Sequence, residues 1–220
     1  AGYVTPLGAQ GLKMGATASR VLYGLDKDDF PAVYQGSVTA LGAYALYPMV
    51  RSRNLNLFGV LSHEYKRFED HQAGTRLGKR SHDWQLGLIG DSRDSVFTGG
   101  INTYELQALQ GRMSFGEGAN PLGLRKDFSK VTLGYSRLQN LQAGRWQLYG
   151  RLKVQWASTT LDASERYAAG GPLGVRAFAP GEAAADDAQV LNAELRWLPP
   201  ESWLGPVARE LAFSLFHDWA

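Results

Sequence analysis

The chain has 220 residues, and 23 Lys and Arg against 21 Asp and Glu give it a formal net charge of +2. This near balance argues against a nucleic-acid-binding protein, which would carry a basic excess on one face or stripe. The chain has no Cys, which excludes a disulfide scaffold and a Cys-ligated metal site. No apolar run reaches the roughly 18 residues that a membrane-spanning helix needs, since the nearest, 38–50, contains Thr39, Gly42 and Pro48.

Apolar and polar residues alternate with a period of two in about ten segments, each of roughly ten residues or more. The alternation is clear in 12–21, in 146–156 and in 189–197, where one face of each segment is apolar and the opposite face is polar or charged. Because such segments are separated by polar stretches, they predict an antiparallel β meander.

Two features favour membrane-spanning strands over a soluble β-sandwich, which would show the same alternation. Soluble strands usually have about five or six residues, whereas strands that cross a membrane need about 9 to 11. Aromatic residues also stand near segment ends, as expected for rings at a membrane interface. These aromatic residues are Tyr23, Tyr34, Tyr47, Phe68, Trp84, Phe97, Tyr135, Trp146, Trp156 and Trp197. A soluble sheet with aromatic strand formers is the alternative.

The connections between segments are alternately short and long. The predicted short links are 6–11, 51–54, 91–95 and 140–144, and the predicted long links are 26–33, 70–80, 113–126 and 159–188. An up-and-down barrel of the outer-membrane type has short periplasmic turns and longer extracellular loops. The link at 199–206 is an exception, because it falls on the short side but has an intermediate length.

The stretch 159–188 is too long for an ordinary hairpin loop, since most loops in compact proteins have about four to six residues. Its centre reads Gly-Gly-Pro-Leu-Gly-Val-Arg-Ala-Phe over 170–178, followed by Pro-Gly-Glu at 180–182. This segment resembles the V-R-[GA]-[YF] loop motif of the two-partner secretion transporters, the family of haemolysin activators and filamentous haemagglutinin transporters. Residues 47–54 resemble the family's Y-P-x-x-R-S-R-x turn, and 216–218 resemble its F-x-D-x-G strand. The resemblance also includes 90–94 and covers essentially the whole chain.

The resemblance implies an all-β fold, an antiparallel transmembrane β-barrel of sixteen strands. Residues 1–220 would supply about ten consecutive strands of it, and the loop at 159–188 would fold into the barrel lumen. The periplasmic cargo-binding domains and the terminal strands would lie outside this chain. A small closed barrel of ten strands is the structural alternative.

The resemblance also carries over functional residues, position by position. The loop motif corresponds to Val175, Arg176, Ala177, Phe178, Gly181 and Glu182, and its partner in the lumen corresponds to Phe216 and Asp218. It implies that Arg176 meets Asp218, and the strand phase agrees, because Asp218 lies on the face opposite Leu215. A guanidinium can hold a carboxylate through two parallel hydrogen bonds, which fix orientation as well as charge.

Three alanines depart from the family pattern. Ala185, Ala188 and Ala220 stand where the family usually has Gly. If those backbones needed a positive φ, Ala would be strained there, so the local path of the loop is the open part of this interpretation.

The implied function is that of a protein-translocating pore in the outer membrane of a Gram-negative bacterium. It would export and activate a large partner exoprotein, such as a haemolysin or an adhesin, by two-partner secretion. The polar residues expected to line the lumen are Arg151, Lys153, Asn192, Glu194 and Arg196. The expected partners are the exoprotein cargo, outer-membrane lipid and the barrel assembly machinery that inserts the barrel. We expect a monomer without a nucleic-acid partner, cofactor, bound metal or enzymatic activity.

Other functions are the alternatives. One is an outer-membrane protein assembly factor of the same superfamily, whose loop motif is similar, although the R-S-R turn favours export. A passive porin-like barrel, an outer-membrane hydrolase and a soluble all-β binding module are the others. No spacing of a metal site or a Ser, His and Asp set supports an enzyme.

Overall fold

The structure is a computed structural model that describes residues 1–24, 34–72, 75–141 and 145–220. Ten strands form one sheet, in which every strand pairs antiparallel with its neighbours. The strands in their order across the sheet are β1 (Gly2–Leu7), β2 (Leu12–Gly24), β3 (Tyr34–Arg51), β4 (Leu55–Gln72), β5 (Thr75–Asp94), β6 (Gly100–Phe115), β7 (Asp127–Leu141), β8 (Trp146–Ala157), β11 (Ala188–Trp197) and β12 (Phe213–Trp219). The short strands β9 (Tyr167–Ala168) and β10 (Ala184–Ala185) form a separate hairpin.

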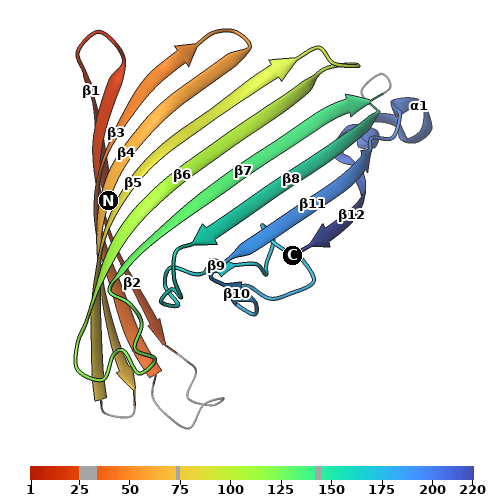
Figure 1. Ribbon diagram of the computed structural model, residues 1–220. Helices are drawn as coiled ribbons and strands as arrows, with labels where there is room; N and C mark the ends of the chain where they lie inside the picture. Colours follow the sequence, from red (N-terminus) through yellow and green to blue (C-terminus); the bar gives the residue numbers. More distant parts are fainter. Residues whose placement is uncertain (25–33, 73–74, 142–144) are drawn as a thin grey trace.

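The large sheet is a curved, open wall with β1 at one edge and β12 at the other (Figure 1). Strict chain order with antiparallel pairing is the arrangement of consecutive strands in an up-and-down barrel, so the predicted all-β fold is confirmed. The strand β5 has 20 residues, twice the roughly 9 to 11 needed to cross a bilayer, so the wall extends beyond the hydrocarbon layer. None of the helices in the described residues is long and apolar enough to cross a membrane.

The two faces of the wall differ in chemistry. We call the face on which the link 158–187 lies the inner face, and the opposite one the outer face. On β5, the inner residues Ser81 and Asp83 are buried, whereas the outer residues Trp84 and Leu86 are 57% and 65% exposed. Large apolar side chains are exposed there because the outer face of a membrane barrel contacts lipid rather than water.

The links fall at two ends of the wall (Figure 1). One end carries the short links 8–11, 52–54 and 95–99, and the other carries the longer links 116–126 and 158–187. The predicted link at 26–33 lies outside the described residues. The link near 199–206 is longer than predicted, because 198–212 includes α1 (Glu201–Leu204) and the 3-10 helix η2 (Gly205–Glu210).

The prediction of a long loop at 70–80 is wrong. β4 continues to Gln72 and β5 begins at Thr75, and the two strands stay in register from Leu55 opposite Ser92 to Gln72 opposite Thr75. The stretch is polar on both faces, which in a sequence is typical of a loop. Strand pairing uses backbone groups, so a hairpin that projects beyond the membrane can be polar on both faces and remain a strand.

The aromatic residues near segment ends divide between the two faces. Trp84, Tyr135, Trp146, Trp156 and Trp197 lie on the outer face, as expected for interfacial rings. The expectation is wrong for two of the others. Tyr23 donates a hydrogen bond to Asp70 on the inner face, and the Phe68 ring is buried there, 4.9 Å from the Lys79 ammonium. Phe97 lies in the turn 95–99, and the side chain of Tyr34 is outside the described residues.

A small apolar core lies beneath the long link. Leu161 of the link packs against Met113 of β6 and Phe128 of β7, and all three are buried. This cluster fixes the start of the link to the inner face, and so positions the residues that follow it.

Candidate functional site

The candidate site is the link 158–187 together with the inner-face residues that it contacts. After Leu161 the link runs out and returns on itself through the β9 and β10 hairpin, where the Ala169 N–H donates to the Ala183 carbonyl at 2.8 Å. Its tip, 170–178, is therefore held at both sides by backbone pairing, and it reaches β11 and β12.

Glycine is required in the tip because the backbone folds tightly on itself. The Val175 N–H donates to the Ala169 carbonyl at 2.7 Å, and this places Gly174 so close that a Cβ atom there would lie 1.9 Å from the Ala169 oxygen. Gly171 has a φ of +98°, which favours glycine. The side chain of Val175 is buried at this crossing.

Replacing Gly174 with alanine is expected to loosen the tip. The added methyl group would force the backbone apart at a cost of about 1–3 kcal/mol, the range for overpacked sites. Limited trypsin digestion should then cut after Arg176 several times faster than in the wild type. The matched control is Gly181→Ala, where a Cβ atom would meet no atom within 4 Å, although the φ of +85° carries some strain. Equal cleavage rates in both variants would contradict the packing argument.

Arg176 and Asp218 are brought together in the structure. The Arg176 Nε donates to Asp218 Oδ2 at 2.9 Å and its Nη2 donates to Oδ1 at 2.8 Å, the bidentate geometry. The Arg176 backbone N–H donates to the same carboxylate at 3.0 Å, and the guanidinium carbon lies 3.7 Å from the centre of the Phe216 ring. The Asp218 side chain is only 4% exposed, so the contact is shielded. We call this contact the tip latch.

Neighbouring residues of β11 complete the tip latch. Asn192 stands opposite Asp218 in the strand register and donates both to Asp218 Oδ1 and to the Gly174 carbonyl, at 2.8 Å each. Glu194 accepts a hydrogen bond from Arg176 Nη1 at 3.1 Å. The polar atoms on which the latch depends thus come from two strands and the tip, which stabilises one position of the loop.

The residues predicted to line the lumen differ in the contacts that they make. Glu194 also accepts from Arg196 Nε at 2.8 Å, and Arg151 donates to the Leu173 carbonyl at 2.6 Å. Lys153 forms a 3.0 Å salt bridge with Glu105 of β6. All five residues expected to line the lumen, Arg151, Lys153, Asn192, Glu194 and Arg196, are on the inner face.

The second half of the motif forms its own turn. Glu182 accepts a hydrogen bond from the Ala179 N–H at 2.8 Å, and Gly181 has a positive φ. Ala177 and Phe178 are exposed, and Phe178 is 48% exposed. The suspected strain at Ala185, Ala188 and Ala220 is not present, since Phe97 is the one non-glycine residue with a positive φ in the described part of the chain.

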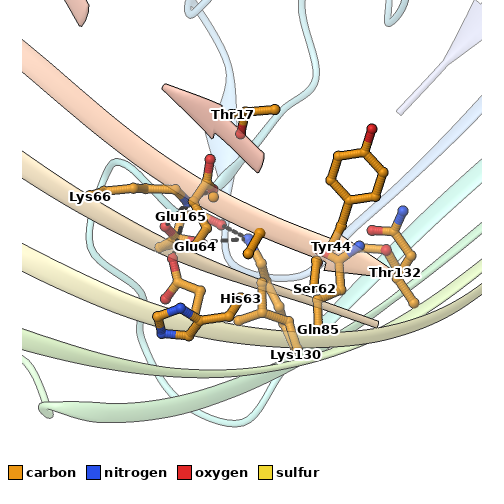
Figure 2. Close-up of a pocket in the computed structure, with 15 residues that line it drawn as sticks. Thr17, Tyr44, Ser62, His63, Glu64, Lys66, Gln85, Lys130, Thr132 and Glu165 are labelled. Carbon is orange, nitrogen blue, oxygen red and sulfur yellow. Dashed lines mark hydrogen bonds and ion pairs between the residues drawn. The ribbon is translucent and has the colours of Figure 1, made fainter. Parts of the chain in front are cut away.

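A second contact between the loop and the wall was not predicted. Glu165 lies between two lysines: it accepts from Lys66 Nζ of β4 at 2.9 Å and is 3.0 Å from Lys130 Nζ of β7. Figure 2 shows Lys66 and Glu165 lining the same pocket, which has a volume of about 350 Å³. Asp162 accepts from Lys79 Nζ of β5 at 2.6 Å. We call these five residues the base anchor.

Burial strengthens the charge interactions within the base anchor. The Glu165 side chain is 3% exposed, and Asp83, also 3% exposed, lies 3.1 Å from Lys66 Nζ. Opposite charges in such a low-dielectric setting interact far more strongly than on a surface, but each depends on its partner to offset desolvation. One signal in the sequence was available, since the inward lysines of β4, β5 and β7 need acidic partners.

Asp162 makes the base anchor sensitive to acid. Burial alone would raise the pKa of the Asp162 carboxyl, but hydrogen bonds from Lys79 and Ser164 outweigh burial, so its pKa is lowered. A lowered pKa means that the ionised carboxyl stabilises the docked loop at pH values above its usual range, and that this stabilisation is lost as the pH falls through the lowered value. At neutral pH the contribution is fully present.

If the inner face lines an ion path, as the sequence predicts, its charges should govern the passage of ions. Reversing Arg151, Lys153 and Arg196 to glutamate in the full-length protein is expected to shift the selectivity of the channel toward cations, because acidic side chains along the path attract them. The measurement is the reversal potential in a planar bilayer under a salt gradient. Arg125→Glu, in the exposed link 116–126, is the control. An unchanged reversal potential in the triple variant would count against these residues as the lining of the ion path.

The histidines do not form a metal site in the described residues, where no group of three or more metal-ligating side chains is found. His63 and His82 instead belong to a cluster of rings on the outer face. The His63 ring centre is 4.6 Å from that of Trp84, and the His82 ring centre is 4.9 Å from that of Tyr65.

Comparison with known proteins places this site in a family. The family model described as haemolysin secretion/activation protein ShlB/FhaC/HecB matches residues 1–219. The heme/hemopexin transporter protein HuxB of Haemophilus influenzae strain 86-028NP is 25% identical over 213 residues, which are 94% of this chain and 37% of that protein. HuxB of strain Rd is 25% identical over 218 residues, with the same shares of 94% and 37%. The chain thus spans little more than a third of the length of these relatives.

Two solved structures share the fold. CdiB from Escherichia coli superposes with a TM-score of 0.67 at 16% identity, covering 84% of this chain and 35% of that one. CdiB from Acinetobacter baumannii superposes with a TM-score of 0.63 at 17% identity, covering 90% of this chain and 36% of that one. With a family model that matches nearly every residue, the chain belongs to the ShlB/FhaC/HecB family of haemolysin secretion/activation proteins, which are outer-membrane transporters of Gram-negative bacteria.

Proposed function

We propose that the full-length protein is an outer-membrane pore that exports and activates one large partner exoprotein by two-partner secretion. Within it, residues 1–220 form part of the barrel wall, and 159–188 form a loop inside the lumen. The family supports a role in secretion and activation, and the chain's own residues support a loop-controlled path.

The observation that carries the proposal is the bidentate contact between Arg176 and Asp218. It joins the tip of a 30-residue link to the last strand, β12, while Glu165 joins its base to β4 and β7. A loop fixed at both ends across the inner face limits passage through the wall's concavity. Release of the loop would widen the path to ions along the polar residues of β8 and β11, whereas export of the cargo would require the docked loop.

No chemical step is needed for this function. Capture of the cargo on the periplasmic side and its folding outside the cell would supply the free energy of export. No nucleotide is required in this scheme. The inner-face charges would keep the path hydrated for an unfolded chain. Outer-membrane lipid and the barrel assembly machinery are the other partners that we propose, with the protein acting as a monomer.

The test compares a strain that lacks the gene with the same strain complemented by the full-length gene. Mass spectrometry of the culture supernatant should show one very large polypeptide that depends on the gene, and this identifies the cargo. If many outer-membrane proteins decline together in the deletion strain, the protein is an assembly factor instead. If neither set changes while small solutes enter more slowly, it is a passive porin-like barrel.

A further inference from the structure

A row of arginines crosses the wall near its long-link end. Arg20 of β2 is opposite Thr39 of β3, which is opposite Arg67 of β4. Arg67 is in turn opposite Arg80 of β5, and Arg80 is opposite Ser114 of β6. We call Arg20, Arg67 and Arg80 the arginine row, since the register places them on one line across four strands.

The arginine row faces outward. Lys66 and Lys79 contact the loop on the inner face, and Arg67 and Arg80 are the next residues along β4 and β5. Because successive side chains of a strand point to opposite faces, both arginines lie on the outer face. Arg20 and Arg80 are exposed, and the Arg67 side chain is 49% exposed.

The aromatic residues give the depth of the row in the membrane. On β5, Trp84 precedes the apolar Leu86 and Leu88, which are 65% and 37% exposed on the outer face. Toward the short-link end, Tyr104 and Tyr135 form a pair with ring centres 5.8 Å apart. Such aromatic residues border the hydrocarbon layer, and Arg80 lies beyond Trp84 on the long-link, extracellular side. The arginine row is therefore at the level of the outer-leaflet headgroups.

Among the described residues, the charges of the row are incompletely balanced. Arg67 and Arg80 stand directly opposite one another, an arrangement that is destabilising for like charges on paired strands. Glu69 is 2.5 Å from Arg67 and 2.7 Å from Arg76, so its one carboxylate serves two guanidinium groups. Neither Arg20 nor Arg80 forms a salt bridge to any of the described residues.

We propose that the arginine row binds the phosphate groups of the phosphorylated glycolipid in the outer leaflet. Guanidinium groups suit phosphate because they offer two parallel donors, and the hydroxyls of Thr39 and Ser114 lie in the same row as further donors. An anion between Arg67 and Arg80 removes their repulsion. The lipid is the occupant because the row borders the apolar band of the outer face, where acyl chains and headgroups meet.

The experiment measures lipid bound to the purified full-length protein by native mass spectrometry, with lipopolysaccharide and its dephosphorylated form as probes. The wild type should bind the phosphorylated probe and lose at least about tenfold in affinity for the dephosphorylated one. The variant Arg20→Gln, Arg67→Gln and Arg80→Gln should lose a similar factor for the phosphorylated probe, since each arginine near an anionic lipid surface contributes severalfold.

The matched control removes three exposed arginines at the short-link end, Arg53→Gln, Arg93→Gln and Arg145→Gln, and should bind like the wild type. Heat-modified electrophoretic mobility reports whether each barrel is folded. Equal binding of both probes by the wild type would overturn the proposal, and this arm does not depend on any variant folding. Equal losses in the two triple variants would overturn it as well, because the effect would then follow total charge rather than the row.

Discussion

Replacing Arg176 with alanine in the full-length protein is expected to lower secretion of the partner exoprotein at least about tenfold at unchanged barrel abundance. The substitution removes both hydrogen bonds to Asp218 and the one to Glu194. Hydrogen bonds to charged groups contribute roughly 1.5–3 kcal/mol each when buried. Arg176 is 28% exposed, so we discount the sum to about 2 kcal/mol, more than a tenfold change in the docked population of the loop.

The measurement is the amount of the large exoprotein in the supernatant, with barrel abundance followed in the outer-membrane fraction. Arg125→Ala removes an exposed loop arginine and serves as the control. A double-mutant cycle separates the latch from a general effect: Arg176→Ala with Asp218→Ala should be no worse than either single variant, because each removes the same interaction. Additive losses would show that the two residues act independently, and normal secretion by Arg176→Ala would remove the tip latch from the mechanism.

Replacing Glu165 with glutamine is expected to detach the base of the loop and to increase channel conductance. Lys66 and Lys130 would then face one another across the cavity with Asp83 as the nearest remaining buried carboxylate. Breaking a buried ion pair by removing one partner typically costs about 3–5 kcal/mol, because the remaining charge loses its compensation. The loss of stability should lie within this range, because Lys130 loses its carboxylate partner, whereas Lys66 keeps Asp83 at 3.1 Å.

Conductance of single channels in planar bilayers is the measurement, together with tryptic cleavage after Arg166, which pairs with Asp186 within the loop. Glu117→Gln, an exposed residue of the link 116–126, is the matched control. If Glu165→Gln and Glu117→Gln have the same conductance and cleavage rates, the base anchor does not hold the loop. Adding Lys130→Gln to Glu165→Gln should restore part of the stability by removing the unpaired cation, while the loop stays detached.

The face on which each strand residue lies could be predicted from the sequence, because the alternation of apolar and polar residues depends only on neighbouring positions. The inward placement of Arg151 and Asn192 follows from the apolar residues beside them, and the structure has them on the inner face. The same alternation places the Asp218 and Leu215 side chains on different faces of β12. The motif at 170–178 indicated the contact of Arg176 with Asp218, 42 residues away, through the family resemblance rather than through spacing.

Tertiary structure decided the features that depend on partners far along the chain. The polar stretch 70–80 is a strand hairpin because β4 and β5 pair with each other through it, from Asp70 opposite Leu77 to Gln72 opposite Thr75, and β3 pairs with its first residues. Local polarity carries no record of that pairing. Tyr23 and Phe68 face inward because the strand register, and not the residue type, determines the face on which each side chain lies. Glu165 meets Lys66 from 99 residues away, and its role arises only when curvature of the wall brings β4, β7 and the loop together. The sequence by itself therefore determined the alternation of strands and the polarity of their faces, whereas the curvature and register of the sheet decided which charges meet, because Coulombic pairing depends on distance in space and not along the chain.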